Sequence, residues 1–360
     1  MSNTIEKLAD IGTMTWLDDL SRERISSGNL ERMIATEKIT GVTTNPAIFA
    51  AAMSAGTSYD EQIERLRAEG ASADAAVYAM SVEDVRNACD AFAEVFRATG
   101  GRDGRVSIEV DPRISADAEA TLKQARELWR QVDRPNAMIK IPATEGSLPA
   151  IPDALAEGIS VNVTLIFSVE RYARVIEAYR EGIHRAARAG HDVSRIFSVA
   201  SFFVSRMDTE VDKRLEALGT PEALALRGKA GVANARRAYG LFRAAFAEAD
   251  LPEGATVQRP LWASTGVKNP DYPATLYVTE LAGPDTVNTM PQATIDAVLA
   301  AEDLRGDTLS GTQEEAEEVF AALEREGIDL DDVFATLERE GVDKFVTAWE
   351  ELLDSMGKRL

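Results

Sequence analysis

The chain of 360 residues contains one cysteine, Cys89, and two histidines, His184 and His191. A single cysteine excludes an internal disulfide framework and is typical of a protein in a reducing compartment. The two histidines flank one predicted helix end, so the chain has too few histidines in suitable places for a histidine-based triad or a histidine metal site. We therefore expect no metal centre, and we expect Cys89, in an apolar helical stretch, to be a core residue.

Basic charge, nucleotide-binding patterns and long apolar runs are also scarce. The formal net charge of −21 argues against nucleic acid and anionic membranes as partners. Neither GxGxxG nor GxxxxGK[ST] occurs, so a nucleotide-binding fingerprint is absent. No apolar run approaches the roughly 20 residues of a membrane span, and the N-terminus lacks the apolar stretch of a secretory signal. These features predict a cytoplasmic protein, and they leave open whether it is a monomer or a homodimer.

Short apolar stretches alternate with amphipathic ones along the chain. Eight stretches have the character of strands, and they begin near residues 13, 39, 105, 136, 158, 194, 256 and 275. The stretches between them have helical periodicity, as in residues 115–132, where Ser115 is the expected N-cap and Asp117 lies in the first turn. Eight strands alternating with helices predict an α/β fold, a single (β/α)8 TIM barrel, with a doubly wound open sheet as the main alternative.

No Gly/Ser/Pro-rich linker divides the chain, so we expect one domain over residues 1–360. A helical insertion is predicted at about 50–104, between the second and third strands. A helical segment at about 312–360 ends the chain, with Phe334, Phe345 and Trp349 on an apolar face. The sequence does not decide whether the insertion forms a lid, an interface or an outer layer of the barrel. For the terminal helix, a cover over the barrel mouth and an interface are the two alternatives.

One strand contains a lysine where apolar residues dominate. Lys140 lies in NAMIKIPAT, residues 136–144, which reads as a buried strand. Lysine is rarely buried without a partner, because removing an ammonium group from water is costly. Burial favours the neutral amine, which is the nucleophile that forms Schiff bases with carbonyl substrates. Lys140 therefore indicates carbonyl chemistry, with a structural ion pair to Glu109 as the alternative.

Polar residues recur near the ends of the predicted strands, where a barrel builds its active site. In chain order they are Asp18, Asn45, Glu109, Lys140, Asn162 with Thr164, Ser201 and Ser264. Arg206 and Lys268 follow the sixth and seventh strands and are candidate phosphate contacts, or else ordinary surface cations. Asn45 precedes Pro46, so a local role in a turn is the alternative there. Two carboxylates in different surroundings can serve as separate acid and base.

These residues lie in motifs that resemble those of the transaldolase family. The motifs are GVTTNPAIF, SIEVDPR, MIKIPAT, NVTLIFS, SFFVSR and ASTGVKNP, and they fall between about residues 11 and 295. The chain length and TVNTMPQATIDA resemble the longer bacterial branch. The resemblance implies a cofactor-independent barrel enzyme of the non-oxidative pentose phosphate pathway. It would transfer a dihydroxyacetone unit from sedoheptulose 7-phosphate to glyceraldehyde 3-phosphate, giving erythrose 4-phosphate and fructose 6-phosphate.

The resemblance also implies roles for individual residues. Lys140 would form the Schiff base, and Asp18 would remove the C4 hydroxyl proton of the sugar. Glu109 and Thr164 would hold a water that shuttles protons during imine formation. The remaining positions would contact substrate: Asn45, Asn162 and Ser201 at the dihydroxyacetone hydroxyls, Phe203 and Ser264 beside them, and Arg206 at the phosphate.

The chain departs from the family pattern at two places. Shorter members have an arginine soon after the Ala-Ser pair that ends the seventh strand. In this chain the first basic residue after Ala263-Ser264 is Lys268, whose ammonium group is a point charge and lacks the two-pronged donor geometry of arginine. SFFVSR has Phe202 and Ser205 where others often have Pro and Gly.

Two other functions stay open from the sequence. The first is an aldolase that releases free dihydroxyacetone, like the related fructose-6-phosphate aldolases, which have Gln and Tyr where this chain has Glu109 and Phe203. The second is a barrel that binds sugar phosphates without catalysis.

Overall fold

The computed structural model describes residues 2–247, 250–301 and 304–360. Eight parallel strands close into a barrel in chain order, with β8 pairing back to β1. The strands are β1 Thr13–Leu17, β2 Gly41–Val42, β3 Arg105–Glu109, β4 Ala137–Pro142, β5 Val161–Ile166, β6 Ser198–Phe203, β7 Arg259–Ala263 and β8 Thr286–Met290. The predicted (β/α)8 barrel is therefore confirmed, and the open sheet is excluded.

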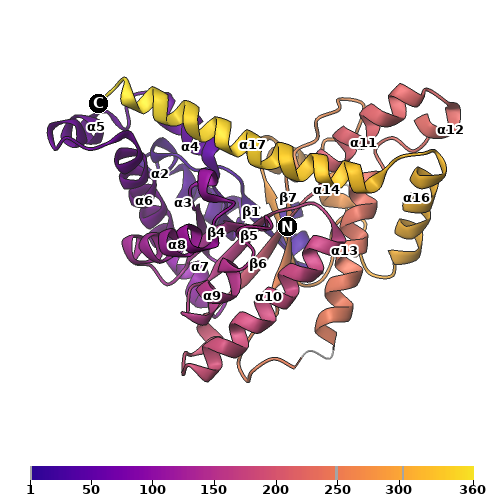
Figure 1. The fold of residues 1–360 in the computed structure, drawn as a ribbon, viewed down its shortest axis with the longest axis horizontal. Helices are drawn as coiled ribbons and strands as arrows, with labels where there is room; N and C mark the ends of the chain where they lie inside the picture. Colours follow the sequence, from indigo (N-terminus) through magenta and orange to yellow (C-terminus); the bar gives the residue numbers. More distant parts are fainter. Residues whose placement is uncertain (1, 248–249, 302–303) are drawn as a thin grey trace.

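Helices surround the barrel (Figure 1). Those in the first part of the chain are α1 Thr4–Ile11, α2 Arg22–Ser26, α3 Asn29–Arg32, α4 Pro46–Ser54, α5 Asp60–Ala68, α6 Ala73–Ala91, α7 Ala93–Ala98, α8 Ala118–Val132 and α9 Ala150–Ala156. The later ones are α10 Val169–Arg188, α11 Ser205–Leu218, α12 Pro221–Leu224, α13 Ala230–Ala247, α14 Leu276–Thr279, α15 Gln292–Ala300, α16 Gln313–Arg325 and α17 Leu330–Gly357. Short turns of other helix types are η1 Met33–Glu37, η2 Pro112–Ile114 and η3 Val193–Arg195.

Two sequence-based assignments are wrong. The stretch near residue 275 is not the eighth strand, because Leu276–Thr279 forms the short helix α14 and the strand follows at Thr286–Met290. β8 is fixed by pairing with β1, where Thr13 faces Thr286 and Leu17 faces Met290, which is a long-range contact that local composition does not reveal. The N-cap of α8 is Asp117 rather than Ser115, since the Asp117 side chain accepts from the backbone N–H of Ala120.

Side chains alternate between the inside of the barrel and the helix layer, because successive residues of a strand point to opposite faces. Trp16, Met138 and Leu261 belong to one apolar cluster, whereas their strand neighbours Leu17 and Ile139 belong to the cluster under the helices. Lys140 lies two residues after Met138 on β4, so the two side chains point to the same face of the sheet. It therefore shares the face of the interior cluster, and the strand geometry alone brings its amine into the barrel.

The insertion and the terminal segment are helical, as predicted. The helices from α4 to α7 lie between β2 and β3, and α16 and α17 end the chain. In Figure 1, α17 (yellow) crosses the molecule from the side of α16 to the side of α4 and α5, where Arg359 bonds Asp60. Phe345 and Trp349 are buried as expected, whereas Phe334 is only partly buried. At Gly341 a side-chain Cβ would lie 3.0 Å from the Phe167 ring, so the helix approaches β5 closely there.

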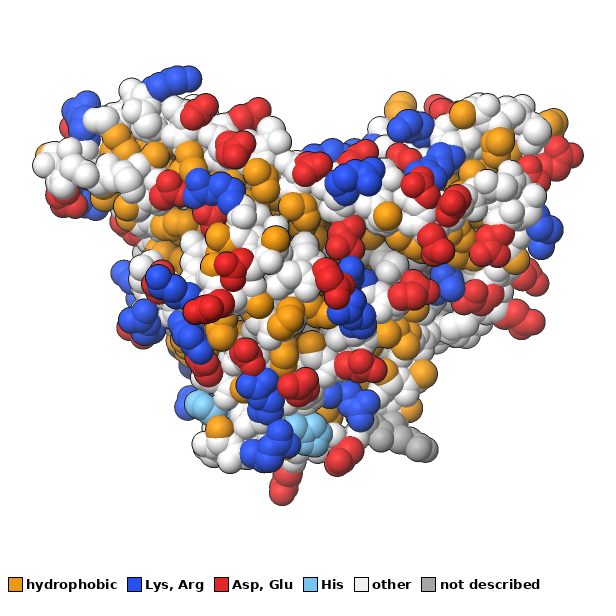
Figure 2. Space-filling view, viewed as in Figure 1, with side chains coloured by type: hydrophobic (Ala, Val, Ile, Leu, Met, Phe, Trp, Pro, Cys, Tyr) orange, Lys and Arg blue, Asp and Glu red, His pale blue; other side chains and the backbone are white. Residues whose placement is uncertain are grey.

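The buried Cys89 is a core residue, as predicted. None of the described helices is long and apolar enough to cross a membrane. On the face drawn in Figure 2, acidic and basic side chains are interspersed.

Asp208 on α11 is a buried carboxylate whose charge is expected to lower stability at neutral pH. It accepts hydrogen bonds from Tyr277 Oη at 2.6 Å and Gly231 N at 2.7 Å, yet burial raises its pKa to about 6. The folded state therefore holds the proton more tightly than the unfolded chain, whose pKa is near 3.8. The resulting stability is complete below about pH 4 and is lost as the pH rises to about 6.

The substitution Asp208→Asn keeps the shape without the charge. We expect it to raise the free energy of unfolding at pH 7.5 by about 1–3 kcal/mol, and to have little effect at pH 4. Urea unfolding at the two pH values measures this, with Asp271→Asn on an exposed loop as the control. A variant that is less stable at both pH values would contradict the expectation.

Candidate active site

Lys140 and Glu109 lie side by side inside the barrel. β3 pairs with β4 in a register that places Glu109 opposite Lys140. Lys140 Nζ lies 3.3 Å from Glu109 Oε2 and donates to the backbone carbonyl of Thr44 at 2.9 Å. Each side chain is only 6% exposed. The costly buried lysine thus has a carboxylate partner, and the ion pair that the sequence left as an alternative is present.

Glu109 is poised to exchange a proton near neutral pH. Burial raises its pKa to about 7, although the neighbouring Lys140 opposes the shift and Asp18 adds to it. A carboxyl group with such a pKa is divided between its acid and base forms under physiological conditions. Glu109 can therefore take up the proton that an attacking amine must release.

Asp18, just beyond the end of β1, is the second carboxylate of the site. Its Oδ1 accepts a hydrogen bond from Thr43 Oγ1 at 2.7 Å, and Thr43 also contacts Thr289 Oγ1 at 2.6 Å. Burial raises the pKa of Asp18 above its ordinary value, while Lys140 and the bond from Thr43 act against that shift. Asp18 and Glu109 therefore have different hydrogen-bonding and charged partners, which suits separate acid–base roles.

Thr164 on β5 lies at an irregular point of the barrel. Its Oγ1 is buried and has no hydrogen-bond partner among the described residues, and Glu109 Oε2 is buried with only its ion pair to Lys140. The register of β5 against β6 shifts between Val163 and Ile166, and Leu165 has a left-handed φ of 58°. Such a bulge redirects side chains and is strained for a non-glycine residue. These two oxygens can each accept or share a further hydrogen bond, which fits the expected role of holding a water molecule.

Asn162 and Ser201 extend the same polar layer. Asn162 lies opposite Lys140 in the pairing of β4 with β5. Ser201 Oγ donates to Asn162 Oδ1 at 2.7 Å, and Asn162 Nδ2 donates to Ser107 Oγ at 3.0 Å. These bonds hold the amide in one orientation, with an N–H still available to a ligand hydroxyl.

Arg206 lies at the mouth of the barrel between two aromatic rings. Its guanidinium carbon is 5.1 Å from the centre of the Phe203 ring and 5.8 Å from that of Phe345 on α17. Its Nη1 is buried and has no partner among the described residues. Lys140 Nζ also lies 5.8 Å from the Phe345 ring. The terminal helix therefore covers the mouth, and one of its side chains reaches both cations.

Three predicted residues lie outside this network. Asn45 caps α4 by accepting from Ile48 N at 3.0 Å, which is the local role considered above, and it lines a pocket of about 430 Å³ next to the site. Ser264, with a left-handed φ of 55°, contacts Ser205 Oγ at 2.9 Å. Lys268 is exposed and lines a different pocket, together with Asp208 on α11.

Three further residues shape the site without having been singled out from the sequence. They are Thr43, Ser107 and Phe345. Thr43 and Ser107 lie in the motifs GVTTNPAIF and SIEVDPR, so their place in these motifs could have identified them as residues of the site. Phe345 was recognised only as part of an apolar helix face. Among the described residues, no group of three or more His, Cys, Asp or Glu side chains is arranged to hold a metal ion.

The fold and the site together define a (β/α)8 barrel enzyme whose candidate nucleophile is a buried lysine beside a carboxylate. The family model described as Transaldolase/Fructose-6-phosphate aldolase matches residues 15–356. The chain belongs to this family.

Similar proteins named Transaldolase align with almost the whole chain. The one from Mycobacterium ulcerans (strain Agy99) is 58% identical over 358 residues, which are 98% of this chain and 96% of that protein. The one from Mycolicibacterium smegmatis is 58% identical over 352 residues, covering 97% and 95%. The one from Kocuria rhizophila is 56% identical over 360 residues, covering 99% and 98%.

Proposed function

We propose that this enzyme is a transaldolase that works through a Schiff base on Lys140. The reaction transfers a dihydroxyacetone unit from sedoheptulose 7-phosphate to glyceraldehyde 3-phosphate. The observation that carries the proposal is the buried Lys140 amine, 3.3 Å from Glu109, a carboxylate whose pKa is raised to about 7 by burial. The match of the chain to the transaldolase family supports the reaction class.

In the first half of the reaction, the neutral amine of Lys140 attacks the C2 carbonyl of the donor. The carbinolamine loses water, with protons moved by Glu109 through a water molecule held with Thr164, and an iminium forms. Asp18 then takes the proton of the C4 hydroxyl, and the C3–C4 bond breaks. Its electrons flow into the iminium, so that erythrose 4-phosphate leaves and an enamine stays on Lys140.

In the second half, the enamine carbon attacks the aldehyde of glyceraldehyde 3-phosphate. Asp18 returns its proton to the new alkoxide, and water added to the iminium releases fructose 6-phosphate and the free amine. Asn162, Ser201 and Asn45 would bind the dihydroxyacetone hydroxyls, next to Phe203 and Ser264. Arg206 would bind the phosphate, with Lys268 as the candidate for a second contact.

A coupled assay with both substrates tests the reaction. Erythrose 4-phosphate should form beyond one equivalent per chain only when glyceraldehyde 3-phosphate is present to accept the dihydroxyacetone unit. Borohydride added with fructose 6-phosphate should attach a stable mass to the peptide that contains Lys140. Free dihydroxyacetone in the absence of an acceptor would instead indicate an aldolase, and binding without any product would indicate a non-catalytic barrel.

Phe345 is expected to contribute to substrate binding from the terminal helix. Phe345→Ala removes the ring that contacts both Arg206 and Lys140. Loss of this contact should raise KM for the donor by roughly 3- to 30-fold. Steady-state kinetics measure the change, with Phe334→Ala on the same helix as the control. An unchanged KM combined with a lower melting temperature would show that Phe345 only packs.

A further inference from the structure

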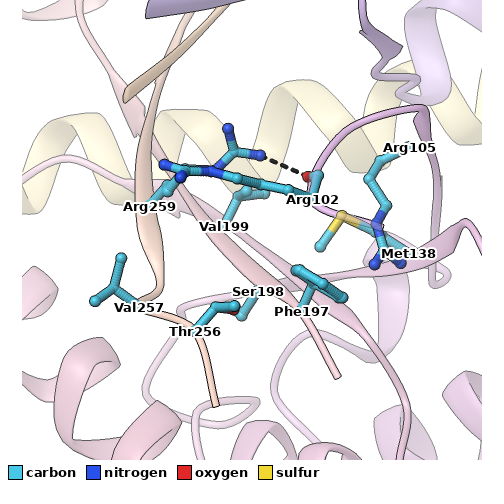
Figure 3. Close-up of a pocket in the computed structure, with 9 residues that line it drawn as sticks. All are labelled: Arg102, Arg105, Met138, Phe197, Ser198, Val199, Thr256, Val257 and Arg259. Atoms are coloured by element: carbon cyan, nitrogen blue, oxygen red, sulfur yellow. Dashed lines mark hydrogen bonds between the residues drawn. The ribbon is translucent and has the colours of Figure 1, made fainter. Parts of the chain in front are cut away.

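A second pocket, lined by arginines and by apolar side chains, lies at the opposite end of the barrel from the polar layer around Lys140 (Figure 3). It is lined by the first residues of three strands, Arg105 of β3, Ser198 of β6 and Arg259 of β7. Its volume is about 240 Å³. Arg102 also lines the pocket, so that three arginines face it, and none of its described lining residues is a carboxylate.

Arg105 is the most unusual residue of this pocket. The whole residue is 1% exposed, and its guanidinium carbon lies 5.0 Å and 4.2 Å from the ring centres of Phe96 and Phe197. Its Nε donates to the carbonyl of Gly101 at 2.7 Å and its Nη1 to that of Pro135 at 3.1 Å. Its Nη2 is buried and has no partner within the described ranges. A charged donor left in this state is destabilising unless something binds it.

The pocket also has more positive than negative charge around it. Arg259 pairs with Asp103 at 3.1 Å, and Asp103 accepts in addition from Trp16 Nε1 at 3.1 Å. The half-exposed Arg102 pairs with Asp285. Within the described part of the chain, Asp103 is therefore the one buried carboxylate beside the two buried arginines of this pocket. Burial and the nearby charge of Arg259 lower the pKa of Arg105 to about 9. The pocket is therefore locally positive in a chain whose net charge is −21.

A second unpartnered group lines the same pocket. Thr256 Oγ1 is buried without a hydrogen-bond partner among the described residues. Figure 3 shows Arg105 approaching from one side, Arg102 and Arg259 from another, and Ser198 and Thr256 below them. A guanidinium N–H and a hydroxyl that line one small cavity match the donors that bind a phosphate group.

We infer that this pocket binds a small phosphate-type oxyanion, either the inorganic ion or the phosphate group of a small metabolite. Arg105 Nη2 and Thr256 Oγ1 would donate to it, and Arg259 would add charge. The ligand would satisfy both orphaned groups and neutralise the excess positive charge. The site is separate from the catalytic one, because it is built on the first residues of the strands rather than the last.

Binding of inorganic phosphate tests the inference directly. The substitution Arg206→Gln removes the candidate phosphate contact at the catalytic site, so that titration calorimetry reports the second pocket. We expect one saturable phosphate per chain, with affinity weakened about tenfold or more when Arg105→Gln is added. No saturable binding up to about 20 mM phosphate, or binding that Arg105→Gln leaves unchanged, would overturn the inference. The test needs no catalysis, so its failure is distinct from failure of the proposed reaction.

Two further variants guard against loss of folding. If Arg105→Gln does not fold, Thr256→Val decides the question, because it removes only the hydroxyl and should weaken phosphate binding about threefold or more. Arg126→Gln is the matched control, since that arginine is exposed and pairs with Glu157 on the surface; it should leave binding unchanged. A parallel titration with glycerol phosphate separates the two sources of the oxyanion, since a metabolite site binds it at least as tightly as the inorganic ion.

Discussion

Lys140→Met is expected to lower transaldolase turnover by about 10⁴-fold or more, because no other group can form the Schiff base with the donor. Methionine keeps most of the side-chain length and suits the neighbouring Phe345 ring. The fold should tolerate the change, since the pKa of Glu109 is already about 7 and the carboxyl can stay protonated without its partner. Turnover in the coupled assay and the melting temperature together measure the effect.

The control for this variant is Lys123→Met, which removes an exposed lysine of α8. It should retain wild-type turnover and the borohydride-stable adduct, whereas Lys140→Met should lose both. A Lys140→Met enzyme with more than about a tenth of wild-type turnover would mean that another amine, or no amine, carries the reaction.

Asp18→Asn is expected to separate bond cleavage from Schiff-base formation. The amide keeps the hydrogen bond from Thr43 but cannot take the C4 hydroxyl proton, so turnover should fall by about 10²- to 10⁴-fold. Lys140 and Glu109 are unchanged, so fructose 6-phosphate should still be trapped on Lys140 by borohydride. Quantitative mass spectrometry of the trapped protein, alongside the coupled assay, measures the two steps.

The neighbouring carboxylate provides the control. Asp19 pairs with Arg24 on α2, so Asp19→Asn should stay close to wild-type turnover. If Asp18→Asn abolished trapping as well as turnover, Asp18 would be needed for imine formation or for the shape of the site, and its assignment as the base for cleavage would be wrong.

The barrel was predictable because its signals are local. Each of the first seven strands is a short apolar run, and each was located correctly from its own residues. The eighth was not, because Leu276–Thr279 contains residues common in strands, whereas Thr286–Met290 is a strand through its pairing with β1. Closure of a barrel joins the two ends of the chain, and no short window of sequence contains that contact.

The centre of the candidate site was predictable for a related reason. Glu109, Lys140 and Asn162 lie on consecutive strands and share one face, so strand order alone brings them together. Lys268 lies on a loop beyond Ser264, whose left-handed φ turns the chain, and the path of that loop has no simple sequence signature. Phe345 reaches the site from a helix whose docking depends on tertiary packing.

The position of α17 has a consequence for the order in which the enzyme matures during synthesis. The last barrel strand ends at Met290, so Phe345 on α17 is translated 55 residues after the final strand has been made. At 5–20 residues per second this takes roughly 3 to 11 s. Until then the barrel has no Phe345 over its mouth, and Arg206 and Lys140 are open to water. A nascent chain in which α17 has not yet docked should therefore bind the donor more weakly than the folded enzyme, with the same rise in KM that is expected for Phe345→Ala.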